Sequence, residues 1–138
     1  MRDGGVRAWL SDLPWDLVVY QNAALCEARN AHHGPSSDGH DAARSLWEAA
    51  MNQEMSLMEV VELCKRCHRL APFTNYNGNT FAAIARTLIR QLSLPDTEDA
   101  VARSLAGHIV AGVASDVELK EFRNFCEGLA QRKGELDG

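Results

Sequence analysis

A chain of 138 residues has the usual size of one domain and is long enough to bury one ordinary hydrophobic core. Its 14 Lys and Arg residues and 19 Asp and Glu residues give a formal net charge of -5, which disfavours nucleic acid and anionic lipid as partners. The longest apolar stretches hold only a few residues, far fewer than the roughly 20 that span a bilayer. We therefore expect neither a membrane protein nor a nucleic-acid-binding protein.

The first part of the chain predicts three helices and one loop. Apolar residues from Val6 to Leu13 lie at helical spacing, and the segment 11–14 is typical of a new helix start near residue 12. Residues 32–40, rich in Gly, Pro and Ser, predict an exposed loop. The stripes expected to face the core are Leu17, Tyr20, Ala24 and Ala28 on the second helix, and Ala43, Leu46, Trp47, Ala50 and Met51 on the third.

A capping box predicts the start of the next helix. In the sequence from Ser56 to Glu59, the serine and glutamate side chains can each bond a free backbone donor of the first turn. Pro72 limits this helix at its other end. The residues expected on its buried face are Leu57, Val60, Val61, Cys64 and Cys67.

Three further helices are expected after a turn-rich link over residues 73–78. The Asn77-Gly78 pair favours positive φ, and Asn79 or Thr80 can cap the helix that follows. A second capping box, Ser115 to Glu118, starts the final helix, which we expect to reach Gly134. The inward stripes are Phe81, Ile84, Ala85, Leu88, Ile89 and Leu92, then Val101, Leu105, His108, Ile109 and Val113, then Phe122, Phe125, Cys126 and Leu129.

These elements predict one all-α domain over residues 1–138, a single bundle of about six helices with mostly short connections. Residues 1–5 are expected to be flexible and residues 134–138 to form a frayed tail. The start of the chain is no apolar signal core, so we expect a cytoplasmic protein with reduced cysteines.

The segment Cys64-Lys65-Arg66-Cys67-His68 matches the pattern for covalent attachment of haem c. The same cysteines can also serve a zinc site, for which Cys26, His108 and Cys126 are the candidate further ligands, or a redox pair. The simpler interpretation is that both cysteines continue the buried stripe of their helix and that the protein holds no cofactor.

Two weaker patterns suggest other chemistry. Residues 27–41 contain His32, His33 and His40 with several carboxylates, which can ligate a divalent metal but without regular spacing. Arg103 and His108 resemble in spacing the Arg and His pairs of some helical ribonucleases, a spacing expected about once by chance here. A small hydrolase or nuclease is thus a third hypothesis.

The link between the two central helices is the candidate binding site for a partner or an anion. Helix N-termini bind anions through free backbone donors, and aromatic residues and arginine are enriched where binding energy concentrates. The candidate residues are Arg69, Phe73, Tyr76, Asn77, Gly78 and Asn79. Since the chain offers amphipathic helices but no convincing catalytic motif, the leading hypothesis is a non-enzymatic module that binds another protein through this link or a helical face.

Overall fold

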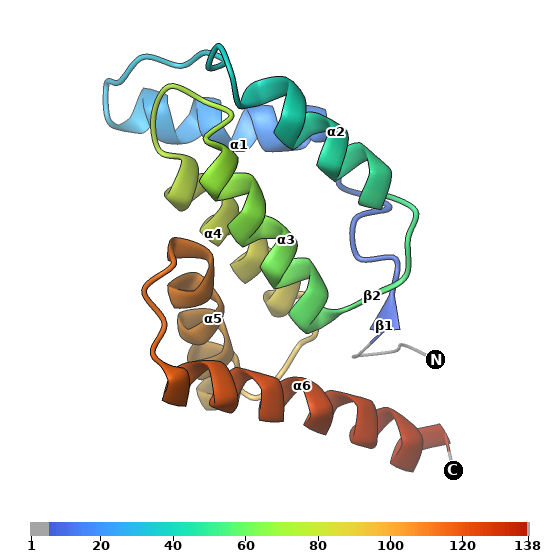
Figure 1. Ribbon diagram of the computed structural model, residues 1–138. Helices are drawn as coiled ribbons and strands as arrows, with labels where there is room; N and C mark the ends of the chain where they lie inside the picture. The colour runs from blue at the N-terminus through green and yellow to red at the C-terminus, as the bar shows by residue number, and fades with distance from the viewer. Residues whose placement is uncertain (1–5, 138) are drawn as a thin grey trace.

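The computed structural model describes residues 6–137, and for residues 130–137 the backbone alone. Within this range the chain forms six helices and two short strands (Figure 1). The helices are α1 (Trp15–Ala28), α2 (His40–Ala50), α3 (Leu57–Leu70), α4 (Asn77–Arg90), α5 (Asp96–Ala111) and α6 (Asp116–Asp137), and the strands are β1 (Val6–Arg7) and β2 (Met55–Ser56). The predicted all-α bundle is confirmed.

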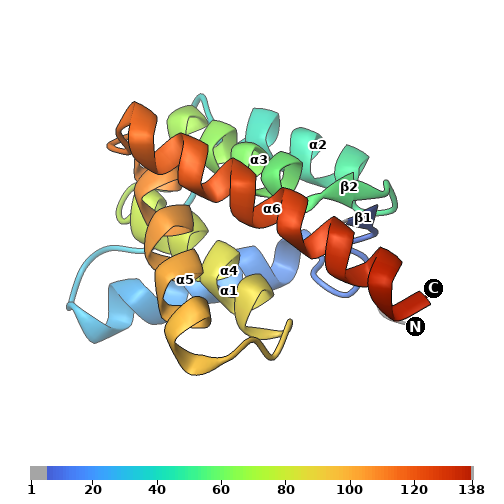
Figure 2. The ribbon, with the colours of Figure 1, turned by 90° about the horizontal axis from the view of Figure 1, so that it is seen from below.

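Helices α3 and α4 lie side by side at the centre of the molecule. Helix α1 packs on α4 and α2 packs on α3, so that this pair covers one end of the centre (Figure 1). Helix α5 contacts both central helices, and α6 crosses the opposite end against α5 and α3 (Figure 2). Because every helix buries one face on a neighbour, a single hydrophobic core runs through the domain.

The core contains a cluster of four aromatic rings between α1, α2, α4 and the link. Trp15 stacks on Phe73 with ring centroids 5.8 Å apart and planes at 11°, and both rings are almost fully buried. Trp47 lies against Trp15 and Phe81, and its indole Nε1 donates a hydrogen bond of 2.9 Å to the Leu13 carbonyl. This bond connects α2 to the segment before α1.

The capping boxes that open α3 and α6 are confirmed. Ser56 Oγ accepts from the Glu59 N–H at 3.1 Å, and the Ser56 N–H donates to Glu59 Oε1 at 2.9 Å. Ser115 and Glu118 exchange the same pair of bonds at 3.2 and 3.1 Å. The predicted inward faces of α2, α3 and α4 are also confirmed, since their residues are buried or packed on the core.

The helix predicted from Val6 to Leu13 is wrong. Val6 and Arg7 instead pair antiparallel with Ser56 and Met55, and the chain then turns back with Trp9 and Leu10 in the core. Eight residues make a marginal helix, whereas pairing with the segment before α3 satisfies the same backbone groups. Helix α1 accordingly starts at Trp15, about three residues later than expected, with Pro14 at its N-cap.

The face of α1 predicted to be buried is its exposed face. Leu17 is 47% exposed and Tyr20 71% exposed, whereas Val18 and Cys26 are fully buried. Helix α1 carries only two charged residues and is apolar on almost every side, so its periodicity does not select one face. The selection comes from its contacts with α4 and α2.

The predicted face of α5 is wrong in part. Leu105 and Ile109 are buried as expected, but Val101 is 49% exposed, Val113 is 69% exposed and His108 lies at the surface. The buried face is shifted toward small residues, because Ala102, Ala106 and Gly107 let α5 pack closely on α4. A Cβ at Gly107 would lie 3.0 Å from a guanidinium nitrogen of Arg86.

The two ends of the chain carry expectations of their own. Helix α6 continues through Gly134 to Asp137, three residues beyond the predicted end. The flexible segment expected at residues 1–5 lies outside the described residues, as does Gly138. Within residues 6–137, no helix combines the length and apolar character needed to cross a membrane.

Candidate functional site

The link between α3 and α4 is shaped by residues in the left-handed backbone region. Ala71 closes α3 at φ 50° and Tyr76 precedes α4 at φ 57°, whereas Asn77 and Gly78 belong to the first turn of α4. Asn77 accepts from the Phe73 N–H through Oδ1 and donates to the Phe73 carbonyl through Nδ2, both at 2.9 Å. The prediction of a positive φ at Asn77-Gly78 is therefore wrong, since both residues are helical. The side chain of Asn77 instead stabilises the turn through its two bonds to Phe73.

Gly78 serves a close approach instead of a turn. A Cβ at this position would lie 3.1 Å from both Cε1 and Nε2 of His68. The His68 ring is held there because its Nδ1 is 2.8 Å from the Val110 carbonyl at the end of α5, where the nitrogen donates. The end of α3, the start of α4 and the end of α5 thus meet at one imidazole ring.

The structure separates the residues predicted for a binding site. Phe73 is 3% exposed and stacks on Trp15, so its ring belongs to the core and offers no contact area to a partner. Tyr76 is half-buried, with the Arg29 guanidinium 5.2 Å from its ring centroid. Arg69 and Asn79 are exposed. Of the aromatic pair, only Tyr76 reaches the surface.

The predicted exposed loop at residues 32–40 is tied to this link. The Ser36 N–H donates to the Pro72 carbonyl at 2.8 Å, and the Thr74 N–H donates to the Gly34 carbonyl at 3.0 Å. The two segments lie together at the upper left of Figure 1. Although several of its side chains are exposed, this loop occupies one side of the link and leaves less of it available to a ligand.

Gly39 marks the tightest point of this contact. A Cβ at Gly39 would lie 1.7 Å from the Leu70 carbonyl oxygen and 2.8 Å from that of Ala71. Both neighbours are backbone atoms, so the clash cannot be relieved by a side-chain rotation.

We expect Gly39→Ala to lower the free energy of unfolding by about 1–3 kcal/mol or more, because the loop has to move away from the end of α3. Chemical denaturation followed by circular dichroism measures this loss. Gly112→Ala is the control that separates backbone strain from a steric clash. Its φ of 79° strains alanine, but a Cβ at this position would have no heavy atom within 4 Å. An unchanged midpoint for Gly39→Ala would show that the loop does not press on α3.

A buried polar network under the two loops was not predicted from the sequence. Asn22 is fully buried, and its Nδ2 donates to the Asn75 carbonyl at 2.8 Å and to Thr80 Oγ1 at 3.0 Å. Its Oδ1 accepts from Nδ1 of His33 at 2.8 Å. Because these bonds satisfy the amide, the network ties α1 to both loops and is structural. In the sequence, the only indication of this network is the polar residue Asn22 on an otherwise apolar helix.

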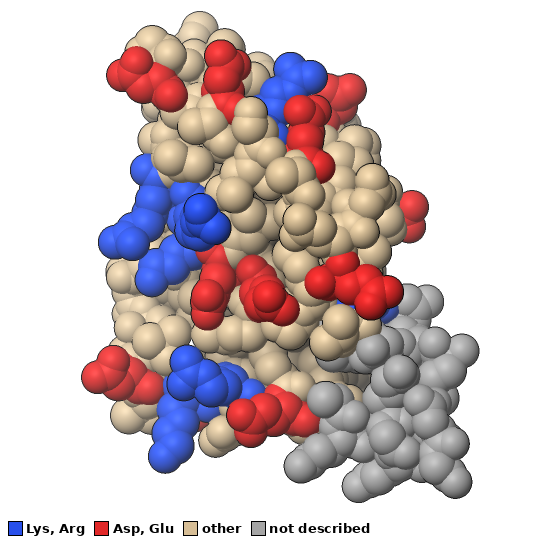
Figure 3. Space-filling view, turned by 45° about the vertical axis from the view of Figure 1, so that its right-hand side comes forward, with Lys and Arg blue, Asp and Glu red and all other residues tan. Residues whose placement is uncertain are grey.

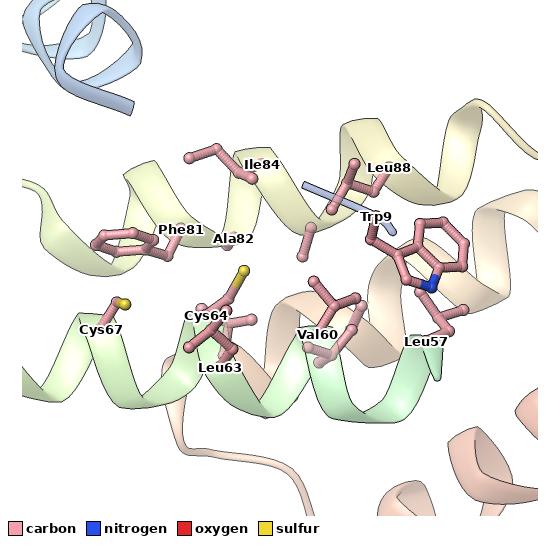
Figure 4. Packing of buried hydrophobic residues seen from close by; sticks show 14 of the residues in the cluster. Trp9, Leu57, Val60, Leu63, Cys64, Cys67, Phe81, Ala82, Ile84 and Leu88 are labelled. Atoms are coloured by element: carbon pink, nitrogen blue, oxygen red, sulfur yellow. The ribbon is translucent and has the colours of Figure 1, made fainter. Parts of the chain in front are cut away.

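The two cysteines of the haem-like motif face the central helix contact. Cys64 and Cys67 are fully buried and point from α3 toward α4, near Ala82 and Phe81 (Figure 4). Burial raises the pKa of both thiols, that of Cys67 to about 12 although Arg66 acts in the opposite direction. This is the environment of core thiols.

The motif as folded does not fit a haem or a zinc ion. Its thiols pack on the side chains of α4, while His68 is bonded to Val110 on α5. No group of three or more His, Cys, Asp or Glu side chains in the part of the chain that the structure describes is placed to hold a metal. The histidines of residues 32–40 therefore belong to no such group.

Slow labelling of the native thiols is the expected result. Burial keeps a reagent away from Cys64 and Cys67, and it raises the folded-state pKa of Cys67 and Cys126 to about 12, from 9.0 for a free thiol, so the reactive thiolate is much scarcer in the folded protein than in the unfolded chain. The unfolded chain loses its thiol protons above about pH 9, so the free energy of unfolding should fall as pH rises from 9 toward 12. Labelling of Cys64 and Cys67 before and after denaturation checks the first expectation, and rapid native labelling would contradict it.

Arg103 and His108 do not form a joint site. Arg103 Nε donates to Asp99 Oδ2 at 2.7 Å on α5, and His108 Nδ1 lies 2.6 Å from Glu118 Oε2 at the start of α6. The backbone N–H of Ser115 and, second, His108 hold the pKa of the Glu118 carboxyl below its usual range. Each group has its own carboxylate partner, so this pair gives the nuclease hypothesis no support.

A groove between α5 and α6 was not predicted from the sequence. It has a volume of about 650 Å³ and is lined mainly by apolar groups. Both helices can be followed in Figure 2, where α6 lies in front. The lining residues are Pro95, Thr97, Glu98, Val101, Ala102 and Leu105 of the α5 side and Glu121, Asn124, Phe125 and Gly128 of α6. The groove was not predicted because Val101, which lines it, was expected to lie in the core.

The surface charge is mixed on the face drawn in Figure 3. Basic and acidic side chains lie there in neighbouring small groups, and neither sign forms an extended patch. Comparison of the chain with protein-family models, with characterised proteins and with solved structures finds no match.

Proposed function

We propose that this chain is a non-enzymatic module that binds another protein, in the cytoplasm, through the groove between α5 and α6. The groove supports the proposal because it is apolar, open and lined by side chains that the fold leaves partly exposed, such as Val101. Exposed apolar surface of this kind marks interaction sites in many proteins. The four cysteines are free thiols, as a reducing compartment requires.

The groove is better suited to a partner than the 72–80 link. At the link, Phe73 is committed to the core and residues 32–40 cover one side, which leaves Tyr76, Arg69 and Asn79 as separate surface contacts. At the groove, two helices present a continuous concave surface of the size typical of ligand pockets, about 300–1,000 Å³. A concave apolar surface gives a partner more buried area for each contact.

Site-specific photo-crosslinking in native cells tests the proposal. A photoreactive residue is placed at Val101 in the groove, at Tyr76 in the link, or at Arg44 on the exposed face of α2 as a control. We expect one discrete adduct from position 101 and none from position 44, and the adduct should disappear when the groove is altered by Leu105→Gln. An adduct from position 76 alone would move the interface to the link, and no adduct from either position would contradict the proposed function.

A further inference from the structure

We propose that Asn77 is a site of spontaneous deamidation, and that the turn before α4 protects it only while the link stays closed. The sequence contains a single Asn-Gly pair, Asn77-Gly78. Asparagine is hydrolysed fastest in front of glycine, since the missing Cβ leaves the next backbone nitrogen free to approach the asparagine side chain. The reaction consumes only water, so this inference is independent of the groove between α5 and α6.

The reaction passes through a five-membered ring. The Gly78 N–H belongs to the first turn of α4, where backbone N–H groups have no partner inside the helix. Hydroxide takes its proton, the nitrogen attacks Cγ of Asn77, and the side-chain amide nitrogen takes up a proton and leaves as ammonia. Water then opens the imide at its bond to Cγ, which gives aspartate, or at the backbone carbonyl, which gives isoaspartate. One amide and one water thus become one carboxylic acid and one ammonia, with no change of oxidation state.

In the closed link, the Asn77 amide is held away from this reaction. Its Oδ1 accepts from the Phe73 N–H and its Nδ2 donates to the Phe73 carbonyl, both at 2.9 Å. Both amide atoms are therefore bonded to the residue four positions earlier in the chain. Asn77 also begins α4, and ring closure has to rotate its ψ out of the helical range to bring the Gly78 nitrogen onto Cγ. The side-chain bonds and the helical turn must both break before the ring can form.

Opening of the link removes both constraints. The link is held closed from outside α4, because the Ser36 N–H donates to the Pro72 carbonyl and the Phe73 ring stacks on Trp15. Tyr76, the residue before the pair, has a φ of 57°, a conformation that costs free energy in a residue other than glycine and that opening relieves. Loops open locally more often than a whole domain unfolds. The rate of deamidation is therefore set by the fraction of time for which the link is open.

Deamidation prevents the link from closing in its original form. Aspartate has no Nδ2 donor, so the Phe73 carbonyl loses its partner and faces a carboxylate oxygen instead. Isoaspartate adds a carbon to the backbone at the first residue of α4 and displaces the Thr80 N–H from the Tyr76 carbonyl, to which it donates at 2.9 Å. The site thereby converts a transient opening of the link into a permanent weakening.

Peptide mapping by mass spectrometry, after incubation of the intact chain in water at mildly alkaline pH, tests the proposal. A synthetic peptide of residues 70–82 is the reference for a fully open link. We expect Asn77 to convert at least about tenfold more slowly in the folded chain than in the peptide, because only opened molecules react. Asn79, which precedes a threonine, is the internal control and should stay intact in both samples. Equal rates in chain and peptide would overturn the protection, and an unreacted Asn77 in the peptide would overturn the site.

Two destabilised variants separate opening of the link from unfolding of the domain. Gly39→Ala pushes residues 32–40 away from the end of α3 and should speed the conversion of Asn77 in the folded chain at least about threefold. Leu88→Ala weakens the core at the other end of α4 and should leave the rate unchanged. An equal acceleration by both variants, or none by Gly39→Ala, would show that opening of the link does not set the rate and would overturn the inference.

A matched pair of substitutions measures the consequence for stability. Asn77→Asp imitates one product, and Asn79→Asp places the same charge on an exposed residue of the same helical turn. We expect the Tm of Asn77→Asp to lie at least about 3 °C below that of Asn79→Asp, because the helix dipole stabilises both carboxylates but only the first loses its donor to Phe73. Equal Tm values would show that the reaction leaves the link intact and would overturn the permanent weakening.

Discussion

Trp47→Ala is expected to lower the free energy of unfolding by about 3–5 kcal/mol, the range for removing a large buried aromatic side chain. Trp47 is fully buried and contacts the rings of Trp15 and Phe81. Its removal leaves a cavity between α1, α2 and α4, and it also leaves the Leu13 carbonyl without the indole donor at 2.9 Å. Since small domains are stable by only about 5–15 kcal/mol, the variant should be near the limit of folding.

Denaturant unfolding monitored by circular dichroism measures this loss, with Trp47→Phe as the matched variant. Phenylalanine retains part of the apolar ring contact but removes the donor and the volume of one ring, so its cost should be smaller, about 1–3 kcal/mol. Equal losses for the two variants would show that the groups removed in both, the indole donor and its five-membered ring, carry the effect, and that the remaining ring contacts do not. A loss below about 1 kcal/mol for Trp47→Ala would contradict the described core.

Leu88→Ala is expected to cost about 2–5 kcal/mol through lost transfer energy and the cavity that remains. Leu88 is 2% exposed on α4 and lies beside Trp9 of the segment before α1 (Figure 4), with which it also lines a pocket. The side chain therefore joins α4 to the segment before α1.

The neighbouring residue of the same helix supplies the control for Leu88. Thr87 is exposed, so Thr87→Ala should change the free energy of unfolding by no more than about 0.5 kcal/mol. Both variants are compared by their denaturation midpoints, with the same dependence of the free energy of unfolding on denaturant concentration. If Leu88→Ala lost less than about half a kcal/mol, this face of α4 would not be packed as described.

The candidate site was only partly predictable because its residues depend on which face of a helix is buried. For α3 and α4, polar and apolar residues are segregated around the helix, so the buried face follows from spacing alone. For α1 the apolar residues surround the helix, and for α5 small alanines compete with larger valines. Because the wrong face of α5 was predicted to be buried, Val101 was assigned to the core and the groove was not predicted.

At the link, residue type alone did not reveal what each side chain contacts. Phe73 was predicted as a surface contact since it stands among polar residues, but the ring reaches Trp15, which is far away in the sequence. Gly78 was predicted to supply a positive φ, but it makes room for His68. Both outcomes depend on neighbours from other helices, which no local pattern contains.

The sequence by itself determined the features that depend on neighbours a few residues away. The capping boxes at Ser56 and Ser115 and the stripes of α2, α3 and α4 are of this kind, because capping and helical periodicity act within one or two turns. Only the tertiary structure decided the burial of Asn22, the pairing of residues 6–7 with β2 and the groove between α5 and α6. Each of these brings together segments far apart in the chain, and their free energy depends on packing and on hydrogen bonds that exist only after the helices have docked.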